Sequence, residues 1–314
     1  MNTITYPHGK PILICGPTAS GKSALGIEIA RKSGAWILNA DALQVYDTWR
    51  ILTARPSEVD EETVPHHLYG HIPLRRTYSV GAWLRDVKKI LETVDRQVII
   101  LGGTGLYFSA LTSGLAEIPE TPSHIRARGN EIRNASHGAE FIEYLSKYDS
   151  DTLAKTDRDN PMRLQRAWEV MEATGRGLAS WQQDTPPPLV PLESANAVVL
   201  NSSPDWLNAR IARRFDRMVA DGALDECKAV MQSGWEPTLP SSRALGAREL
   251  VAYLREECTL DEAKESATIA TRQFAKRQRS WFRNKMQDWQ QVPLDDQTDI
   301  AVLAGLILQR GDLS

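Results

Sequence analysis

The chain has 314 residues, 42% of them hydrophobic and 25% charged, and a formal net charge of −3, so it can bury a substantial core divided between two lobes. The near-neutral charge excludes nucleic-acid binding through the overall field of the protein, and any such contact requires a local basic patch. The three cysteines, Cys15, Cys227 and Cys258, lack metal or redox spacing, and no apolar run has the length of a membrane span, so we expect a cytoplasmic protein without a membrane partner.

The first predicted strand, Pro11 to Cys15, leads directly into a glycine-rich segment and then into a predicted helix, Ala24 to Arg31. The segment fits the spacing G-x-x-x-x-G-K-[ST] at every position. In such a loop backbone N–H groups turn toward one anion, the lysine adds a positive charge, and the serine hydroxyl can bind Mg²⁺. The alternative is an ordinary glycine-rich turn, but the coincidence of strand, loop, Lys-Ser and helix favours a polyphosphate site. Its residues are Gly16, Pro17, Thr18, Ala19, Ser20, Gly21, Lys22 and Ser23.

Three further apolar runs predict buried parallel strands: Trp36 to Asn39, Val98 to Leu101 and Ala197 to Leu200. Helical sequence separates most of them, and this alternation is typical of an α/β fold in which ligands collect at the carboxyl ends of the strands. Asp41 follows the second run, and Gly102-Gly103-Thr104-Gly105 follows the third. We therefore predict a P-loop-containing parallel sheet core with three polar segments at one edge.

A helical, charge-rich stretch interrupts the strand pattern between residue 116 and the proline cluster at 186–188. Prolines also stand near its beginning, at Pro119 and Pro122, as is common at joints between domains. We predict a helical insertion domain over residues 116–194, grafted into a core formed by residues 1–115 and 195–314. After Pro204 the sequence is again mostly helical, with breaks at Gly222, Gly234 and residues 237–240.

A local basic patch is predicted within the last long helical stretch. Arg272, Lys276, Arg279 and Arg283 fall at intervals of four, three and four residues, which places them on one face of a helix. No acidic residue occurs between residues 268 and 287. The alternative is a solvated basic face, but a row of cations beside aromatic residues also suits an RNA backbone.

The role of Asp41 stays open from spacing alone. Phosphate-loop kinases and ATPases usually carry an acidic Mg²⁺ ligand after a second apolar strand, whereas Val98 to Leu101 ends in Gly-Gly-Thr. Asp41 can supply that ligand, act as a general base, or cap the turn toward residues 43–46.

Nine segments together make the chain resemble the tRNA dimethylallyltransferases, also called tRNA isopentenyltransferases, of the bacterial type. Each is moderately specific alone, but their order and spacing cover nearly the whole chain. They are GPTASGKS (16–23), NADALQVY (39–46), TARPS (53–57), VPHHL (64–68), GGTGLY (102–107), NPMRLQRAWEVMEATG (160–175), RIARRF (210–215), RALGARE (243–249) and TRQFAKRQRSWFR (271–283).

The resemblance implies transfer of a dimethylallyl group from dimethylallyl diphosphate to the exocyclic amine of the adenosine just 3′ of the tRNA anticodon. It implies that the phosphate loop holds the leaving diphosphate in place of a nucleotide, with Mg²⁺ as cofactor bound through Ser23. Arg214 would add positive charge as the allylic C–O bond breaks. Because Arg210, Arg213 and Arg217 lie nearby, motif alignment alone does not decide among these arginines.

Two catalytic residues follow from the same resemblance. Asp41 matches the family's aspartate, which accepts the proton of the adenine amine as that poor nucleophile attacks. Thr104 matches the threonine of GGTGLY, whose hydroxyl is expected near the reacting centre. The alternative for Thr104 is capping of the helix that starts near Leu106.

The resemblance also implies segments that contact the tRNA anticodon stem-loop, whose adenine must leave its stack to react. Packing of a helix through Trp168 and a surface charge at Arg248 are the alternatives for two of them. The implied contact residues are Asp41, Ala42, Leu43, Gln44, Thr104, Arg126, Gln165, Arg166, Ala167, Trp168, Glu169, Arg243, Ala244, Leu245, Gly246, Ala247 and Arg248.

The sequence departs from the common family pattern in a few places. Ala247 stands where an aromatic residue is common, and Ala42 and Leu43 replace the usual Ser and Met. No Cys/His zinc-finger spacing occurs near the carboxyl end, and the adjacent His66 and His67 lack partner ligands at useful spacing. We expect a monomeric tRNA prenyltransferase. The alternatives are a phosphate-loop kinase of a small metabolite, an RNA-binding protein with a regulatory nucleotide such as ATP in the loop, and a prenyltransferase that acts on free adenine nucleotide.

Overall fold

The computed structural model describes residues 8–311 and divides the chain into two compact units. The first unit runs to Thr112 and resumes at Leu189, and the second unit is Ser113–Pro188. The second unit begins and ends a few residues earlier than the insertion at 116–194 that the sequence predicts. At the joint, the N–H of Val190 donates to the carbonyl of Leu111 at 3.0 Å.

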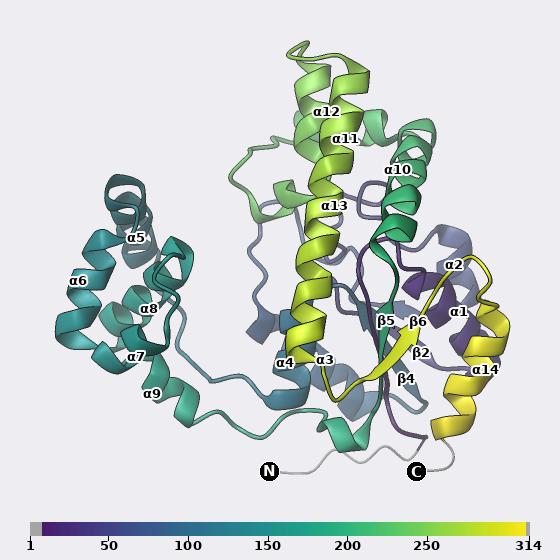
Figure 1. Ribbon diagram of the computed structural model, residues 1–314, viewed down its shortest axis with the longest axis horizontal. Helices are drawn as coiled ribbons and strands as arrows, with labels where there is room; N and C mark the ends of the chain where they lie inside the picture. The colour runs from purple at the N-terminus through teal and green to yellow at the C-terminus, as the bar shows by residue number, and fades with distance from the viewer. Residues whose placement is uncertain (1–7, 312–314) are drawn as a thin grey trace. The chain divides into compact units, whose positions relative to one another are not determined.

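The first unit is built on a six-stranded parallel sheet in the order β3-β2-β4-β1-β5-β6. This confirms the predicted α/β class with a parallel core. Figure 1 labels β2, β4, β5 and β6 of this sheet. The phosphate loop follows β1, which lies between β4 and β5, so the loop opens at the centre of the sheet's carboxyl edge. The strands are β1 (Ile12–Cys15), β2 (Trp36–Asn39), β3 (His66–His67), β4 (Val98–Gly102), β5 (Asn196–Asn201) and β6 (Gln290–Pro293).

The strands β3 and β6 were not predicted from the sequence, because both lie at edges of the sheet. The two residues of β3 are histidines, whose rings contact neighbouring aromatic side chains: His67 stacks on Trp36 with ring centroids 4.3 Å apart. In β6 only Val292 is buried. Neither strand therefore shows the continuous apolar run by which buried parallel strands are recognised.

Alternate residues of the central strand bury against opposite layers of helices. Ile12 and Ile14 belong to the cluster that contains residues of α1 and α14, whereas Leu13 and Cys15 belong to the cluster of α3 and α4. A third cluster joins α10, α11, α12 and α13. The helices of this unit are α1 (Lys22–Ser33), α2 (Glu58–Thr63), α3 (Val80–Thr93), α4 (Gly105–Ser113), α10 (Pro204–Ala220), α11 (Ala223–Gln232), α12 (Ala247–Leu254), α13 (Leu260–Lys285) and α14 (Ile300–Gly311), with 3₁₀ turns η1 (Leu192–Ser194) and η2 (Pro240–Arg243).

The breaks in the carboxyl-terminal helical region coincide with glycines at two places. Gly222 (φ 106°) separates α10 from α11, and Gly234 (φ 87°) follows α11. A further break between α12 and α13 has no glycine or proline; there Glu256 adopts a φ of 62°. An acidic residue in the left-handed region gives no sequence signal, so this break was not predicted.

The second unit is helical, and no strand occurs among its residues, all of which are described. Its core gathers Phe141, Leu145, Leu164 and Trp168. Asn160 caps the helix Pro161–Thr174 by accepting a hydrogen bond from the N–H of Arg163. The helices are α5 (Ser123–Ser136), α6 (Ala139–Tyr148), α7 (Ser150–Lys155), α8 (Pro161–Thr174) and α9 (Leu178–Gln183). Across residues 8–311, no helix combines the length and the hydrophobicity needed to cross a membrane.

Candidate active site

The phosphate loop connects β1 to α1 and presents free backbone donors. Within the described chain, the N–H groups of Gly21, Lys22 and Ser23 have no hydrogen-bond acceptor. They stand at the amino-terminal end of α1, where the helix dipole also favours an anion. The Ser20 hydroxyl is buried in the loop without a partner in the same described region. These groups together are suited to bind an anion.

The loop is held in a strained shape by an arginine of α10. Ala19 adopts a φ of 63°, in the left-handed region that favours glycine. Its carbonyl accepts a hydrogen bond from Nε of Arg210 at 2.8 Å, and the Arg210 guanidinium lies over the Trp206 ring at 4.5 Å. Arg210 therefore stabilises the backbone conformation of the phosphate loop.

Two further cationic side chains, Lys22 and Arg214, lie near the phosphate loop and Asp41. Burial lowers the pKa of Lys22 to about 8, the charge of Asp41 acts in the opposite direction, and Arg214 lowers the pKa further. Burial likewise lowers the pKa of Arg214, while Asp41 raises it. Because Arg213 and Arg217 are exposed and Arg210 binds the loop backbone, Arg214 is the arginine of α10 that lies with Lys22 and Asp41. The sequence alone did not make this distinction.

Asp41 lies in a turn formed by residues 39–43 directly after β2, called the Asp41 turn below, and a buried asparagine fixes the shape of this turn. Asn39 is fully buried, and its side chain accepts the N–H of Asp41 at 2.8 Å and donates to the carbonyl of Asp41 at 3.0 Å. The same amide donates to the carbonyl of Leu68 at 3.0 Å, and the carbonyl of Asn39 accepts the Trp83 indole N–H at 2.7 Å. The backbone of Asp41 is therefore fixed on both sides.

The two carboxylate oxygens of Asp41 differ in their hydrogen bonding. Oδ1 accepts the N–H of Leu43 at 2.9 Å, as a turn cap does. Within residues 8–311 no hydrogen bond reaches Oδ2, which lies 3.3 Å from the point where a Cβ on Gly103 would stand. The capping interpretation and the general-base interpretation are thus compatible, because each uses a different oxygen.

Thr104 lies in the segment 102–105 that ends β4, and it connects this segment to the Asp41 turn by hydrogen bonds. Its Oγ1 accepts the N–H of Ala42 at 2.9 Å, and its own N–H donates to the carbonyl of Ala40 at 3.1 Å. The hydroxyl proton of Thr104 remains available as a donor beside Asp41. The side chain is therefore engaged with the Asp41 turn.

The glycines around Thr104 allow three close approaches. A Cβ at Gly102 would stand 2.1 Å from the carbonyl oxygen of Ala40, one at Gly103 would stand 2.4 Å from Nε2 of Gln278, and one at Gly105 would stand 2.2 Å from the Trp281 ring. No real side chain tolerates such distances. The Gly-Gly-Thr-Gly sequence stands where phosphate-loop kinases usually carry an acidic residue. Its glycines allow the backbone near the Asp41 turn and the side chains of α13 to pack closely against it.

Gln278 of α13 is a site residue that sequence reasoning missed. Its Oε1 accepts the N–H of Thr18 at 2.8 Å, and its Nε2 donates to the carbonyl of Gly103 at 2.9 Å. Gln278 is only 6% exposed and shares the buried face of α13 with Ala275 and Phe282. A glutamine at an apolar position of a helix is the signal that could have identified it.

The predicted tRNA-contact residues of the first unit differ in accessibility. Ala42 and Leu43 are partly exposed, whereas Gln44 is buried and its amide donates to the carbonyls of Thr53 and Ala54, each at 2.9 Å. In the other segment Arg243 and Arg248 are exposed, Leu245 is partly exposed, and Ala244, Gly246 and Ala247 are buried.

The predicted contact residues of the second unit are mostly internal. Gln165 donates to Glu169 at 2.7 Å and accepts from Arg133 at 2.7 Å, and both Gln165 and Glu169 are buried. Ala167 and Trp168 belong to the core of that unit. Arg166 donates to Thr121 at 2.8 Å, and Arg126 is exposed. The tRNA contacts of these residues remain predictions, with the arginines the accessible members.

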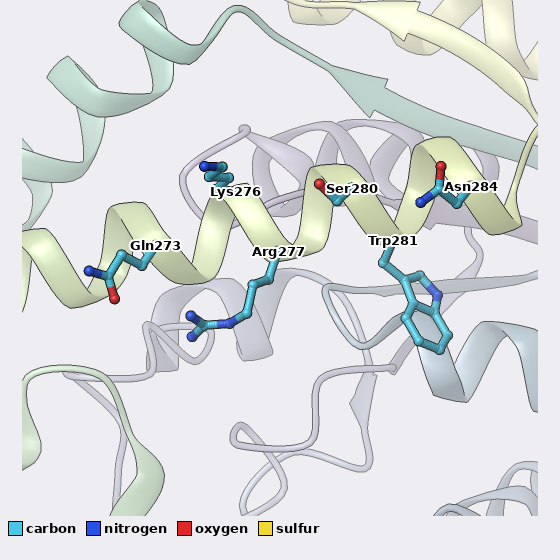
Figure 2. Close-up of a pocket in the computed structure, with 6 residues that line it drawn as sticks. All are labelled: Gln273, Lys276, Arg277, Ser280, Trp281 and Asn284. Atoms are coloured by element: carbon cyan, nitrogen blue, oxygen red, sulfur yellow. The ribbon is translucent and has the colours of Figure 1, made fainter. Parts of the chain in front are cut away.

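The predicted basic face of α13 is present in the structure. Arg272, Lys276 and Arg283 are exposed and Arg279 is partly buried. Beside this row lies an open hollow of about 500 Å³, and in Figure 2 the side chains of Arg277 and Trp281 point to the same side of the helix. The hollow is lined by Gln273, Lys276, Arg277, Ser280, Trp281 and Asn284.

The oxygen ligands of the site suit Mg²⁺ only together with a phosphate. The Ser23 hydroxyl is exposed at the start of α1, and Asp41 Oδ2 is the free carboxylate oxygen. Among the described residues no group of three or more His, Cys, Asp or Glu could hold a metal ion. Mg²⁺ commonly binds to one or two protein oxygens and completes its shell with substrate phosphates and water, so the residues present fit that mode.

The fold and the site define a P-loop α/β protein in which the loop lysine, Lys22, interacts electrostatically with the carboxylate of Asp41. The chain belongs to the IPP transferase family, which it matches over residues 44–285, and residues 10–66 match the isopentenyl transferase family. It is 55% identical to a tRNA dimethylallyltransferase of Cereibacter sphaeroides over 92% of this chain and 90% of the relative. The enzyme of the same name from Dinoroseobacter shibae is also 55% identical, over 92% of this chain and 96% of the relative.

Solved structures show the same fold. The tRNA delta(2)-isopentenylpyrophosphate transferase of Staphylococcus epidermidis is 27% identical, with a TM-score of 0.67 over 97% of this chain and 100% of that one. A eukaryotic dimethylallyltransferase acting on tRNA has a TM-score of 0.81 at 24% identity, over 97% of this chain and 79% of that one. At that identity the second likeness supports the fold alone.

Proposed function

We propose that this protein transfers a dimethylallyl group from dimethylallyl diphosphate to the exocyclic amine of the adenosine 3′-adjacent to the anticodon in tRNA. The relatives at 55% identity carry the name of this activity. The observation that carries the proposal is the free Oδ2 of Asp41 near an anion site with two partly buried cations. A base and a leaving-group site in one unit are what such a displacement requires.

In the proposed reaction the adenine nitrogen attacks the allylic carbon and a C–N bond forms. The C–O bond to the diphosphate breaks, and its electron pair leaves with the diphosphate. The proton of the amine passes to Oδ2 of Asp41, from which it returns to solvent. Oδ2 also orients the amine, whose lone pair is delocalised into the purine ring.

The leaving diphosphate gains negative charge as the C–O bond breaks. Lys22, Arg214 and the free N–H groups of residues 21–23 stabilise this charge, and they are already in place before the reaction. Mg²⁺ bound through Ser23 would neutralise further charge on the diphosphate. The hydroxyl of Thr104 is a donor next to the reacting atoms.

The acceptor is proposed to be the tRNA anticodon stem-loop, bound by a monomer. The exposed Arg243, Arg248, Arg126 and the basic face of α13 supply cations for its backbone. A free nucleotide would not need a basic row of this length. The target adenine would leave its stack to meet Asp41.

One experiment tests the proposal directly. Purified protein, Mg²⁺ and dimethylallyl diphosphate are incubated with unmodified tRNA, and the anticodon fragments are weighed by mass spectrometry. We expect the mass of one isoprene unit on the adenosine next to the anticodon. Addition to AMP or ATP instead, or ATP hydrolysis without any need for the allylic diphosphate, would contradict the proposal.

A further inference from the structure

The amide of Gln278 connects two segments that are far apart in the sequence. Its oxygen accepts the N–H of Thr18 in the phosphate loop, and its nitrogen donates to the carbonyl of Gly103 in the turn that carries Thr104. Because an N–H can only donate and a carbonyl can only accept, these partners fix the amide in one orientation. Among side chains that do not ionise, only glutamine and asparagine offer an acceptor and a donor on separate atoms in this way.

The surroundings hold the amide in place. Gln278 is 6% exposed between the buried Ala275 and Phe282 on the inner face of α13. Its Nε2 would stand 2.4 Å from a Cβ at position 103, so the approach depends on Gly103 having no side chain. A buried amide with both ends bonded costs free energy to disturb, since either partner would be left unsatisfied.

The link spans the two halves of the proposed reaction. Thr18 belongs to the loop that receives the leaving diphosphate, and Gly103 precedes Thr104, whose hydroxyl accepts the N–H next to Asp41. The Oδ2 of Asp41 lies on the same side of Gly103 as the Gln278 amide. The Gln278 amide is therefore the direct side-chain connection between the leaving-group loop and the turn of the base.

We infer that Gln278 is a positioning residue, which holds the diphosphate loop and the Asp41–Thr104 turn at the separation that in-line displacement requires. The inference rests on the proposed prenyl transfer. Gln278 keeps the N–H of Thr18 throughout the cycle, so that the diphosphate is bound by the donors of residues 21–23 and by the two cations. Its loss affects the rate of the chemical step more than the binding of either substrate.

Two variants separate this role from simple packing. Gln278→Met preserves volume and removes both hydrogen bonds; we expect kcat to fall about 100-fold, the scale for a displacement of about 1 Å, with little change in KM for dimethylallyl diphosphate. Gln278→Glu keeps the acceptor for Thr18, but an ionised carboxylate cannot donate to the carbonyl of Gly103. Protonation restores that donor, so the activity of this variant relative to the wild type should rise as the pH is lowered from about 8 to about 6, because burial raises carboxyl pKa values.

Gln287→Glu is the matched control, because Gln287 is exposed just after α13. Its activity relative to the wild type should not change with pH. The inference is overturned if Gln278→Met keeps the wild-type kcat, or if the relative activity of Gln278→Glu does not depend on pH. If the wild type itself does not prenylate tRNA, the proposed function fails, which is a different outcome.

A third measurement needs no variant. In a crystal structure of the wild type with inorganic diphosphate, we expect the oxygen of Gln278 to remain within hydrogen-bond distance of the N–H of Thr18. An amide that has turned away, with the N–H of Thr18 on a phosphate oxygen, would refute the role as a fixed connection. This test applies even if both Gln278 variants fail to fold.

Discussion

Asp41 uses one carboxylate oxygen for its own turn, and within residues 8–311 the other accepts no hydrogen bond. Asp41→Asn keeps an acceptor for the N–H of Leu43, so the Asp41 turn should keep its conformation. An amide, however, cannot accept the proton of the adenine amine. We expect single-turnover prenyl transfer to fall by about 10³-fold, with tRNA affinity nearly unchanged, as measured by rapid quench and filter binding. Asp47→Asn, an exposed aspartate with the same change, serves as the control. Loss of tRNA binding with normal single-turnover chemistry would refute the assignment.

Lys22 gives the site a pH dependence with a defined sign. Burial lowers its pKa to about 8 in the free protein, so its positive charge is lost as the pH rises above that value. We expect KM for dimethylallyl diphosphate to increase above about pH 8 and kcat at saturation to change less, because bound diphosphate restores the charge. Lys22→Met should show a high KM without this rise. A KM that is flat with pH in the wild type would contradict the prediction.

The same lowered pKa affects stability. The unfolded chain holds the Lys22 proton up to its ordinary value of 10.5 and the folded chain only to about 8. Between these values the unfolded state binds more protons, so this group makes the free energy of unfolding increase with pH. At neutral pH, where the buried ammonium is charged, Lys22 lowers the stability of the fold while serving the anion site.

At the scale of elements, α13 turns one face to the core and another to solvent. Arg272→Gln combined with Lys276→Gln removes two exposed charges without touching the buried face. Each phosphate contact contributes to the salt dependence of binding, so we expect the slope of log K against log salt to decrease by about 1.5. The double variant Lys88→Gln and Lys89→Gln, on the exposed side of α3, should leave the slope unchanged. If both slopes are equal, the face of α13 is only solvated.

The strands that the sequence predicts differ in burial from those that it does not. The strands β1, β2, β4 and β5 follow from continuous apolar runs, because both of their faces are buried. Edge strands β3 and β6 carry too few buried residues to form such a run. Asp41 and Lys22 stand in local motifs, whereas the roles of Asn39 and Gln278 depend on partners that only the folded chain brings near. A glutamine at an apolar position of α13 marks Gln278 as unusual, but the sequence does not show which groups it binds.

The molecule as a whole consists of a complete sheet core with a helical unit inserted into it. Because Val190 donates to Leu111 at the joint, the two ends of the core lie next to each other, and a short Gly/Ser linker can replace residues 113–188. We expect this shortened protein to fold and to bind dimethylallyl diphosphate, as measured by circular dichroism and calorimetry, but not to prenylate tRNA. Full prenylation, or a core that cannot fold, would contradict this picture.

Asn39 has a consequence for the economy of each reaction cycle. Its buried amide fixes the backbone on both sides of Asp41 when the chain folds, so in the proposed reaction this backbone would not have to be rearranged in each turnover. An incoming purine would then meet an acceptor whose backbone is already ordered, and ordering it would add nothing to the barrier. On the proposed mechanism, a single amide at the end of β2 would therefore complete this ordering once, during folding, and not in every turnover.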